Sequence, residues 1–273
     1  MKKNVIFSDL DGTLLNYEDR KSFISEKNLK AIDSWIENGN FFSVATGRNI
    51  KSAKRFLEHN KFNYNLPLVL SNGTVLYDIK KNHIIYQEIL NSKIIDDAVK
   101  YILSEEKALM FLITADKHYM LEPKNKEKFK MPVFDYTLIT KDQIPYDSIT
   151  KVSFSVTKDR SEEVLKDVKG FKSFDLLELI PSAPTYIEMI NKGTSKITGI
   201  KRILEYVGIN DYTIYTIGDY INDYEMIKNA DVGFAPLNAH QDILEIADHV
   251  VCHHNDGAIS DMIKKINELK GSK

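Results

Sequence analysis

The sequence predicts an α/β protein whose parallel sheet is doubly wound, with helices on both faces. Short apolar segments alternate with amphipathic helical segments at both ends of the chain, and this order is typical of such sheets. Between the two ends, residues 80–188 mix longer strands with helices, which indicates an inserted α+β domain. We therefore expect residues 1–79 and 189–273 to form the core and residues 80–188 the inserted domain.

The first part of the chain carries three apolar strand segments separated by two helical ones. Leu29, Ile32 and Ile36 recur at helical spacing, and Gly39 follows at a point where helices commonly end. The expected strands are residues 5–8, 41–45 and 66–70, and the expected helices are residues 25–38 and 50–59.

The last part repeats this alternation, whereas the middle departs from it. Ile197, Ile200 and Ile203 share one helical face. After residue 189 we expect helices at residues 194–207, 221–228, 240–247 and 258–269 and strands at residues 212–217, 232–235 and 249–252. In the middle we expect strands at residues 109–114 and 118–121, helices at residues 94–104 and 161–168, and a polar stretch at residues 122–130.

Composition excludes several classes of protein. The 37 Lys and Arg residues nearly balance the 39 Asp and Glu residues, so no basic bias argues for a nucleic-acid or membrane partner. Cys252 is the only cysteine, which excludes a disulfide framework and a thiolate zinc cluster. The apolar stretch before Asp9 is too short for a signal peptide or a spanning helix, so we expect a cytoplasmic protein.

Two aspartates, Asp9 and Asp11, follow the first apolar strand segment. An isolated pair of this kind most often lies in a turn or a solvated loop, and like charges that are buried together are costly unless compensated. Here, however, small or polar residues also follow the strand segments that end near residues 45, 70 and 217. Ligands bind beyond the carboxyl ends of the strands in an open parallel sheet, so we expect the four segments to meet at one edge.

Asp9, Asp11, Asp219 and Asp223 would then share one small volume. A hard divalent cation compensates such a set, and oxygen-only ligands suit magnesium. Because magnesium in proteins usually pairs with substrate phosphate, the expected substrate carries a phosphate. Lys196 lies at the start of a predicted helix, where both the helix end and its own charge favour an anion.

Small and hydroxylated residues complete the expected phosphate site. Thr46 offers a hydroxyl group, and Gly47 lets the backbone approach a ligand closely. Gly12 has the same permissive role in the first loop.

Four motifs occur in a fixed order: Asp-Leu-Asp-Gly-Thr at residues 9–13, Ala-Thr-Gly-Arg at residues 45–48, the lysine at 196, and Gly-Asp-x-x-Asn-Asp at residues 218–223. In this order they resemble the motifs of the haloacid dehalogenase (HAD) superfamily, whose core is Rossmann-like. The chain is most similar to the Cof-like phosphatases, which carry a cap domain between the second and third motifs. The resemblance runs from residue 5 to Gly257 and includes residues 71–74, 234–239 and 255–257.

The resemblance implies two catalytic aspartates. Asp9 is similar to the family nucleophile, which attacks phosphorus and forms an aspartyl-phosphate. Asp11 is similar to the general acid, which protonates the leaving alcohol and later activates water. Asp11 also fits a phosphate ester better than a carbon–halogen bond, because a halide leaves without a proton. The Asp9 carboxylate, the Asp11 backbone carbonyl and Asp219 would bind Mg²⁺, with Asp223 close by or acting through water.

The resemblance also implies a set of substrate-binding residues. Thr46, Lys196 and Asn222 would hold the phosphoryl oxygens, and the family pattern favours Lys196 over its neighbour Lys192. Gly47 and Arg48 belong to the second motif, and Arg48 would lie at the substrate edge. Asn72 and Gly73 would contribute there as well.

Structural explanations remain open for several of these residues. Asp219 and Asp223 could cap a helix, Arg48 could be a surface residue, and Asn72-Gly73 could be only a hairpin turn. Adjacent residues of an extended segment point apart, so we expect His253 and His254 to face solvent. Trp35 is expected to pack in a helical apolar pattern. The cap aromatics Tyr119, Phe129, Phe134 and Tyr136 could contact a substrate ring, but packing is the expected role for most of them.

The sequence thus predicts a Mg²⁺-dependent phosphatase that acts on small phosphorylated metabolites, such as sugar phosphates or phosphorylated cofactors. A sugar phosphomutase would use the same residues, and product analysis would separate the two. A regulator that binds a phosphorylated ligand without turnover is the alternative from outside the enzymes. The complete set of catalytic residue types argues against it.

Overall fold

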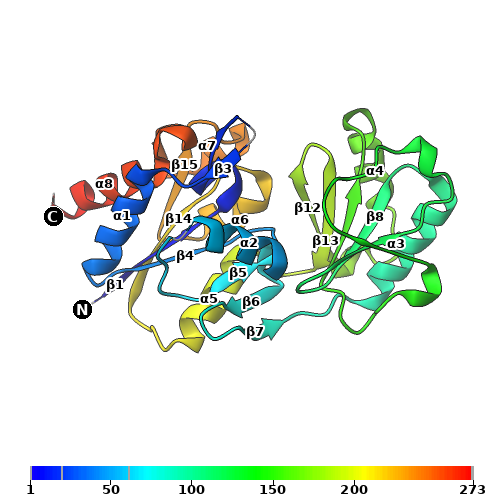
Figure 1. The fold of residues 1–273 in the computed structure, drawn as a ribbon, viewed down its shortest axis with the longest axis horizontal. Coiled ribbons are helices and arrows are strands. Elements are labelled where there is room, and N and C mark those ends of the chain that lie inside the picture. The colour runs from blue at the N-terminus through cyan, green and yellow to red at the C-terminus, as the bar shows by residue number, and fades with distance from the viewer. Residues whose placement is uncertain (1, 20, 61, 272–273) are drawn as a thin grey trace.

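The protein, described by a computed structural model, consists of two lobes (Figure 1). The structure describes residues 2–19, 21–60 and 62–271. Both chain ends lie in the core lobe, on the left of Figure 1, and the middle of the chain builds the cap lobe on the right. Within the described residues, no helix is both long enough and apolar enough to span a membrane.

A five-stranded parallel sheet forms the centre of the core lobe. Its strands, in spatial order, are β16 (His249–Val251), β15 (Val232–Pro236), β14 (Tyr212–Ile217), β1 (Lys3–Ser8) and β4 (Phe41–Val44). Every neighbouring pair runs parallel, so the carboxyl ends of all five strands face the same way.

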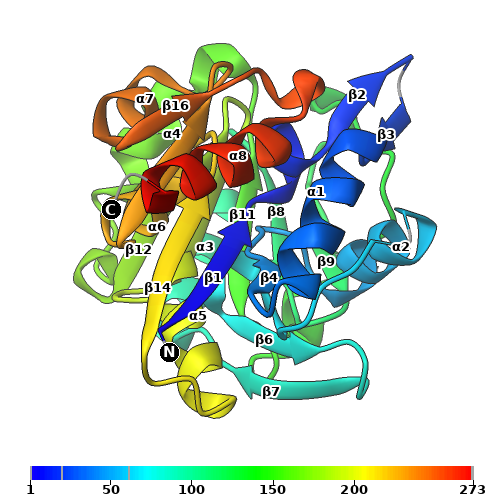
Figure 2. The same ribbon diagram turned by 90° about the vertical axis from the view of Figure 1, so that its left-hand side faces the viewer.

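Helices cover both faces of this sheet because the strand residues alternate in direction. Ile6 of β1 packs on one side with α1 (Glu26–Glu37), α2 (Ile50–Asn60) and α8 (Ala258–Gly271). Val5 and Phe7 pack on the other side with α5 (Lys196–Tyr206), α6 (Tyr224–Lys228) and α7 (Gln241–Ile246). Figure 2 shows α8 and α1 on the near side of β1 and β14.

Two small antiparallel units extend the core lobe. A hairpin of β2 (Asn16–Glu18) and β3 (Lys21–Phe23) follows the helical turn η1 (Leu10–Leu14). A three-stranded sheet consists of β5 (Leu68–Leu70), β6 (Val75–Asp78) and β7 (His83–Gln87). One parallel bridge between Ala45 and Val69 joins β5 to the end of β4, so β5 runs in the same direction as the strands of the main sheet.

A six-stranded, mainly antiparallel sheet forms the cap lobe. Its strands, in spatial order, are β10 (Thr137–Ile139), β9 (His118–Leu121), β8 (Leu109–Ile113), β11 (Lys151–Ser155), β13 (Tyr186–Asn191) and β12 (Leu177–Ala183). Helices α3 (Ser92–Glu105) and α4 (Ser161–Val168) pack on one face over residues such as Val152, Phe154 and Met189. The other face carries Lys151, Ser153 and Glu188 and is turned toward the core lobe, as their contacts below show.

The structure confirms the predicted α/β class with a parallel core sheet and a second α+β unit. Most expected helices and strands are present within one or two residues; the helix expected at residues 194–207, for example, begins at Lys196, after the N-cap residue Ser195. The segment expected as one helix at residues 221–228 is a short turn, η7 (Ile221–Asp223), followed by α6. The division at residues 79 and 189 stays a prediction. The β6–β7 hairpin crosses the first position and β13 the second.

Candidate active site

Four loops at the carboxyl ends of β1, β4, β5 and β14 meet at one edge of the core lobe, as the motif positions lead one to expect. The Thr13 hydroxyl donates to Asp219 Oδ1 at 2.7 Å and so joins the first loop to the loop after β14. Asn222 Nδ2 donates to Asn72 Oδ1 at 3.3 Å and so joins that loop to the one after β5. The candidate residues are therefore neighbours in space although they are up to 214 positions apart, from Asp9 to Asp223.

Lys196 lies at the centre of the site. Its Nζ donates to Asp9 Oδ1 and to Asp223 Oδ1, at 2.6 Å in each case, and the residue is only 1% exposed. Burial alone would lower the pKa of Lys196, but Asp223 and Asp9 raise it above its ordinary value, so the side chain is a cation. Lys192 is exposed at the end of β13, so the geometry favours Lys196 as the cation of this site.

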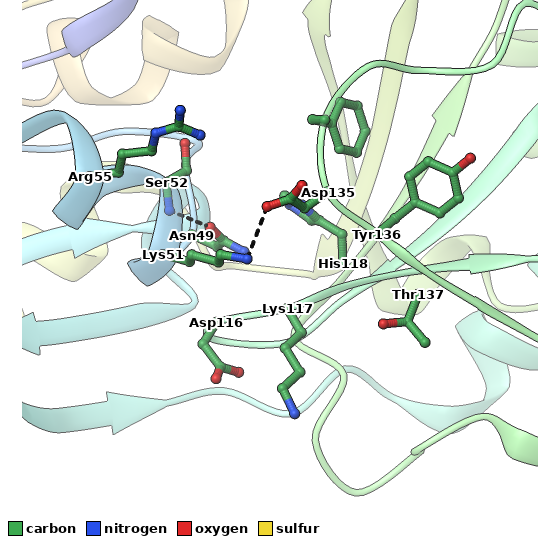
Figure 3. A pocket seen from close by; sticks show the side chains of 11 residues that line it. Asn49, Lys51, Ser52, Arg55, Asp116, Lys117, His118, Asp135, Tyr136 and Thr137 are labelled. Carbon is green, nitrogen blue, oxygen red and sulfur yellow. Dashed lines mark hydrogen bonds and ion pairs between the residues drawn. The ribbon is translucent and has the colours of Figure 1, made fainter.

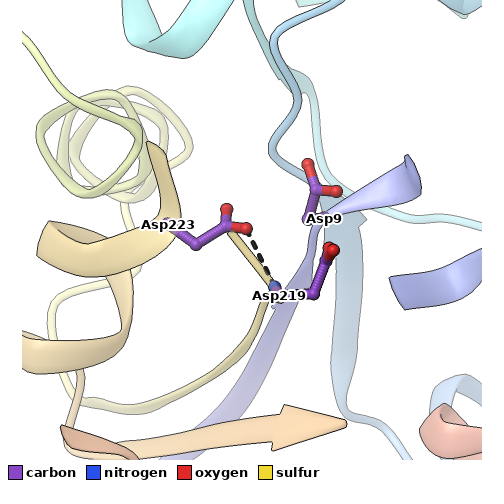
Figure 4. A group of neighbouring side chains, drawn as sticks. All are labelled: Asp9, Asp219 and Asp223. Atoms are coloured by element: carbon purple, nitrogen blue, oxygen red, sulfur yellow. Dashed lines mark hydrogen bonds between the residues drawn. The ribbon is translucent and has the colours of Figure 1, made fainter. Parts of the chain in front are cut away.

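Three carboxylates form an acidic group around this lysine. Ligand oxygens of Asp9, Asp219 and Asp223 all lie within 4.8 Å of one another, and Figure 4 shows the three side chains pointing toward one another. Burial and, beyond it, the neighbouring carboxylates raise the pKa of Asp9 well above its ordinary value, although Lys196 acts against this. Burial, followed by the charge of Asp223, raises the pKa of Asp219 to about 7.

This group fits a hard divalent cation. All of its donors are carboxylate oxygens, the kind of ligand that magnesium takes. Lys196 provides one positive charge for three closely spaced carboxylates, so a divalent cation would balance the remaining negative charge. Asp223 also holds the loop after β14 in place, because its Oδ2 accepts hydrogen bonds from the N–H groups of Asp219 and Tyr220 at 3.0 and 3.2 Å.

Asp11 has other partners. Arg48 donates to its two oxygens from Nε at 2.7 Å and from Nη2 at 2.5 Å, and the Tyr17 hydroxyl donates to Oδ1 at 2.7 Å. Burial works to raise the pKa of Asp11, but the hydrogen bonds and charge of Arg48, together with Tyr17, lower it overall. The carboxylate is therefore ionised at neutral pH. Arg48, for which a surface role was open, is held at the rim of the site by this pair.

The predicted phosphate loops lie close against this centre. Thr46 is buried, and its Oγ1 accepts the N–H of Arg48 at 3.2 Å. Asn72 and Gly73 make the tight turn between the antiparallel strands β5 and β6, so they are both a hairpin turn and part of the site. Gly73 has a φ of +101°, and any side chain there would overlap the Ser195 carbonyl at the start of α5.

A pocket of about 700 Å³ opens above these loops between the two lobes. From the core it is lined by seven of the predicted site residues, and from the cap by residues that include His118, Phe134 and Glu188; the core residues are Asp9, Asp11, Thr46, Gly47, Arg48, Asp219 and Asn222. This volume is in the range of pockets that hold small metabolites. Of the four cap aromatics, Phe134 is 38% exposed and lines this pocket, whereas Tyr119 and Phe129 pack against apolar clusters of the cap.

A second hollow adjoins the first and shares Asn49, Ser52, His118 and Phe134 with it. Figure 3 shows Lys51, Arg55 and Lys117 around this hollow, with Tyr136 on its cap side. Lys51 Nζ is paired with Asp135 Oδ2 at 3.1 Å, across the gap between core and cap.

Sequence reasoning missed four residues that shape the site: Tyr17, His118, Lys151 and Glu188. Lys151 and Glu188 had a usable signal, since each is a charged residue within an otherwise apolar or hydroxylated strand segment. Tyr17 had none, because the β2–β3 hairpin that carries it was not predicted.

One expectation from the sequence is wrong. His254 is buried, although it was expected to face solvent with His253. The chain turns at η8 (His254–Asp256) and is not extended, so the ring points inward and its Nδ1–H donates to the Leu15 carbonyl at 2.6 Å. Trp35, by contrast, packs in the core as expected and donates its Nε1–H to the Phe41 carbonyl at 2.9 Å.

The sequence pattern of the haloacid dehalogenase-like hydrolases matches residues 6–263, and the chain therefore belongs to this family. It is 27% identical over 266 residues to a 5-amino-6-(5-phospho-D-ribitylamino)uracil phosphatase of Bacillus subtilis, covering 95% of this chain and 94% of that protein.

Two solved structures share the fold of the whole chain. A HAD/COF-like hydrolase from Plasmodium vivax is 24% identical, with a TM-score of 0.80 and 98% and 96% of the two chains covered. A HAD subclass IIB sugar phosphatase is 19% identical, with a TM-score of 0.81 and 97% and 99% covered. The resemblance to Cof-like HAD proteins is thus confirmed, and the family supports the predicted enzyme class, a HAD-type phosphoric monoester hydrolase.

Proposed function

We propose that the protein is a Mg²⁺-dependent phosphatase that hydrolyses phosphate monoesters of small metabolites through an aspartyl-phosphate on Asp9. One observation carries this proposal. The Asp9 carboxylate lies at the end of β1, beside the buried Lys196 and two further carboxylates, and lines the pocket between the lobes. A nucleophile, a cation for the phosphoryl oxygens and oxygen ligands for a metal are thereby brought together, as phosphoryl transfer requires.

Each step has a residue to perform it. One Asp9 oxygen attacks phosphorus, and the bond from phosphorus to the ester oxygen breaks as the aspartyl-phosphate forms. Asp11 donates its proton to the departing alkoxide, which leaves as the alcohol. Asp11 then takes a proton from water as the water attacks phosphorus, and phosphate leaves with Asp9 restored. When bound, Mg²⁺ would supply positive charge to the phosphoryl oxygens and balance the charge of the three carboxylates.

The contacts of Asp11 indicate how its two roles are separated. Its pKa is lowered in this structure, which suits the base of the second step. The acid role needs a protonated carboxyl group. An arriving phosphate dianion would attract Arg48 away from Asp11 and place a negative charge beside it, and both changes raise the pKa of a carboxyl group.

Four groups form the proposed phosphate cradle: the Thr46 hydroxyl, the backbone at Gly47, the Lys196 ammonium group and the Asn222 amide. Thr46, Gly47 and Asn222 line the pocket, Asn222 also contacts Asn72, and Lys196 is held beside Asp9. Phe134, His118 and Lys117 line the pockets from the cap side, and Lys51 and Arg55 of α2 line the adjoining hollow from the core side, so these residues would face the leaving group. This arrangement favours sugar phosphates and phosphorylated cofactors.

The decisive experiment measures phosphate release from sugar phosphates, phosphorylated cofactors, nucleotides and 5-amino-6-(5-phospho-D-ribitylamino)uracil, with and without Mg²⁺. We expect Mg²⁺-dependent release with a ranked preference, and a loss of at least about 10⁴-fold in Asp9→Asn, whose shape is unchanged but whose nucleophile is gone. Retained turnover in Asp9→Asn with an unchanged melting temperature would exclude Asp9 as the nucleophile.

The two alternatives have distinct signatures in the same assay. A phosphomutase would return the phosphoryl group to a sugar, so product analysis with a bisphosphate activator would show an isomerised ester in place of free phosphate. A phospho-ligand regulator would be stabilised against heat by a ligand of the panel without releasing phosphate.

A further inference from the structure

Two buried charges of opposite sign lie on the face of the cap sheet that meets the core. Lys151 begins β11 and is 2% exposed, and Glu188 in β13 is 7% exposed. Lys151 Nζ donates to Glu188 Oε1 at 2.6 Å. We call these two residues the bridging pair. Burying a charge pair costs desolvation energy, and apolar residues of similar size often stabilise a fold at least as well, so stability alone is a weak explanation for it.

Both members of the bridging pair also reach across to the core. Lys151 Nζ donates to the Gly47 carbonyl at 3.1 Å, in the loop after β4. Glu188 Oε2 accepts from Asn72 Nδ2 at 2.5 Å, in the turn after β5. Asn72 in turn accepts from Asn222 at 3.3 Å, in the loop after β14. One continuous chain of polar contacts thus runs from the cap through three of the four loops of the active site.

The turn that Glu188 contacts is not a relaxed one. Ser71 and Asn72 both have positive φ, at +49° and +59°, in a region of backbone conformation that residues other than glycine rarely adopt. Two backbone hydrogen bonds hold this turn against the loop after β4, from Ser71 N–H to the Arg48 carbonyl and from Asn72 N–H to the Thr46 carbonyl. A strained backbone persists only where its surroundings fix it, and the bridging pair supplies such contacts from the cap.

We propose that Lys151 and Glu188 are positioning residues that align the phosphate loops of the core when the cap is docked on it. The inference rests on the proposed phosphatase function and extends it. Glu188 also lines the pocket, but its two oxygens accept from Lys151 and Asn72. The pair therefore acts through Gly47 and Asn72 and not on the leaving group, and its effect on turnover is the same for every substrate. When the cap moves away, both contacts break together and the loops lose their alignment.

The test replaces the pair by apolar residues, Lys151→Met with Glu188→Leu. Both are changed together because removal of one partner would leave the other charge buried and unpaired. Lys107→Met is the matched control: it removes another ion-paired cap lysine, bound to Asp167 at 2.8 Å and Glu163 at 2.9 Å, which takes no part in the site.

In the double variant we expect a melting temperature within a few degrees of the wild type. We expect kcat to fall by about 10- to 100-fold, because a small misplacement of the reacting groups carries a cost of this size. The factor should be the same for three substrates with different leaving groups. KM should change little. Hydrogen–deuterium exchange of the peptide that contains residues 71–73 should become faster. Lys107→Met should change neither kcat nor this exchange.

Two results would overturn the inference. One is an unchanged kcat together with unchanged exchange at residues 71–73. The other is a loss that differs between substrates and lies mainly in KM, which would assign the pair to direct contact with the leaving group. If the wild type releases no phosphate from any ester, the proposed function fails by itself. The exchange measurement still decides whether the bridging pair holds the loops.

Discussion

The active-site loop after β1 depends on a glycine at one position. Gly12 has a φ of +79°, and a Cβ atom there would overlap the carboxylate of Asp219, one of the three acidic residues of the site. A side chain at residue 12 would therefore have two separate effects. It would strain the backbone, and it would displace a proposed metal ligand.

Gly12→Ala separates these costs when it is compared with Gly39→Ala. Gly39 has nearly the same φ, +76°, but among the described residues, apart from Gly39 and its two chain neighbours, no heavy atom lies within 4 Å of the position that its Cβ would take. Both variants should lose about 1–2 kcal/mol of unfolding free energy from the positive φ. Only Gly12→Ala should also lose Mg²⁺-dependent turnover, by about 10²-fold. Urea unfolding and phosphate release measure the two effects, and equal turnover in both variants would contradict the role given to Gly12.

At the scale of the element, the start of α5 fixes the central cation. Ser195 is the N-cap residue: its side chain accepts the N–H of Thr198, and the Thr198 hydroxyl accepts the N–H of Ser195. Lys196 is the first residue of the helix, so the cap determines where its side chain begins. The helix therefore links a local capping arrangement to the contacts of Lys196 with Asp9 and Asp223.

Ser195→Ala should weaken this link, and Ser25→Ala provides the matched control. Ser25 caps α1, and its hydroxyl accepts the N–H of Asn28 at 3.4 Å, the same distance as from Ser195 to Thr198 N–H. Each variant should lose about 1 kcal/mol of stability, the usual cost of an N-cap serine. Only Ser195→Ala should lower kcat, because only its helix carries Lys196 into the site. A kcat that falls equally in both variants would mean that the effect is one of stability alone.

The sequence predicts well those elements that have a clear local pattern of apolar and polar residues. Asp9, Thr46 and Asp219 each come within two positions of the end of an apolar strand, so the parallel order of the strands was enough to place them at one edge. The β2–β3 hairpin has no clear alternation of apolar and polar residues, and it was missed together with Tyr17. His254 was placed wrongly because a short turn, which adjacent residues do not reveal, reverses its direction.

At the scale of the whole molecule, contacts between lobes could not be derived from any local pattern. Lys151 contacts Gly47, 104 positions away, and Glu188 contacts Asn72, 116 positions away, and both contacts depend on how the cap docks. The same holds for the pair of Lys51 with Asp135, which are 84 positions apart. The sequence therefore predicts the chemical groups of the core, whereas the arrangement of the cap above them requires the tertiary structure.

We expect His118 to make the stability of the folded protein depend on pH. It lies at the start of β9, lines both pockets between the lobes and contacts the Phe134 ring at 5.3 Å between centroids. Burial, followed by the charge of Lys151 and, more weakly, of Lys51, lowers its pKa from 6.5 to about 4, although the backbone at Asp135 acts in the other direction. Between these two values the unfolded chain binds a proton that the folded protein does not, so stability falls as the pH falls.

His118→Gln should remove this dependence. Between pH 7 and pH 4.5, the wild type should lose on the order of 1 kcal/mol more unfolding free energy than the variant, because partial exposure of the ring reduces the full effect. Urea unfolding at several pH values measures the difference, and the exposed His83→Gln is the control. Parallel pH curves for wild type and His118→Gln would show that protonation of His118 does not destabilise the folded protein. If the curves diverge only below pH 6.5, His118 is the group that titrates, and the charge of Lys151, a member of the bridging pair, contributes to its lowered pKa.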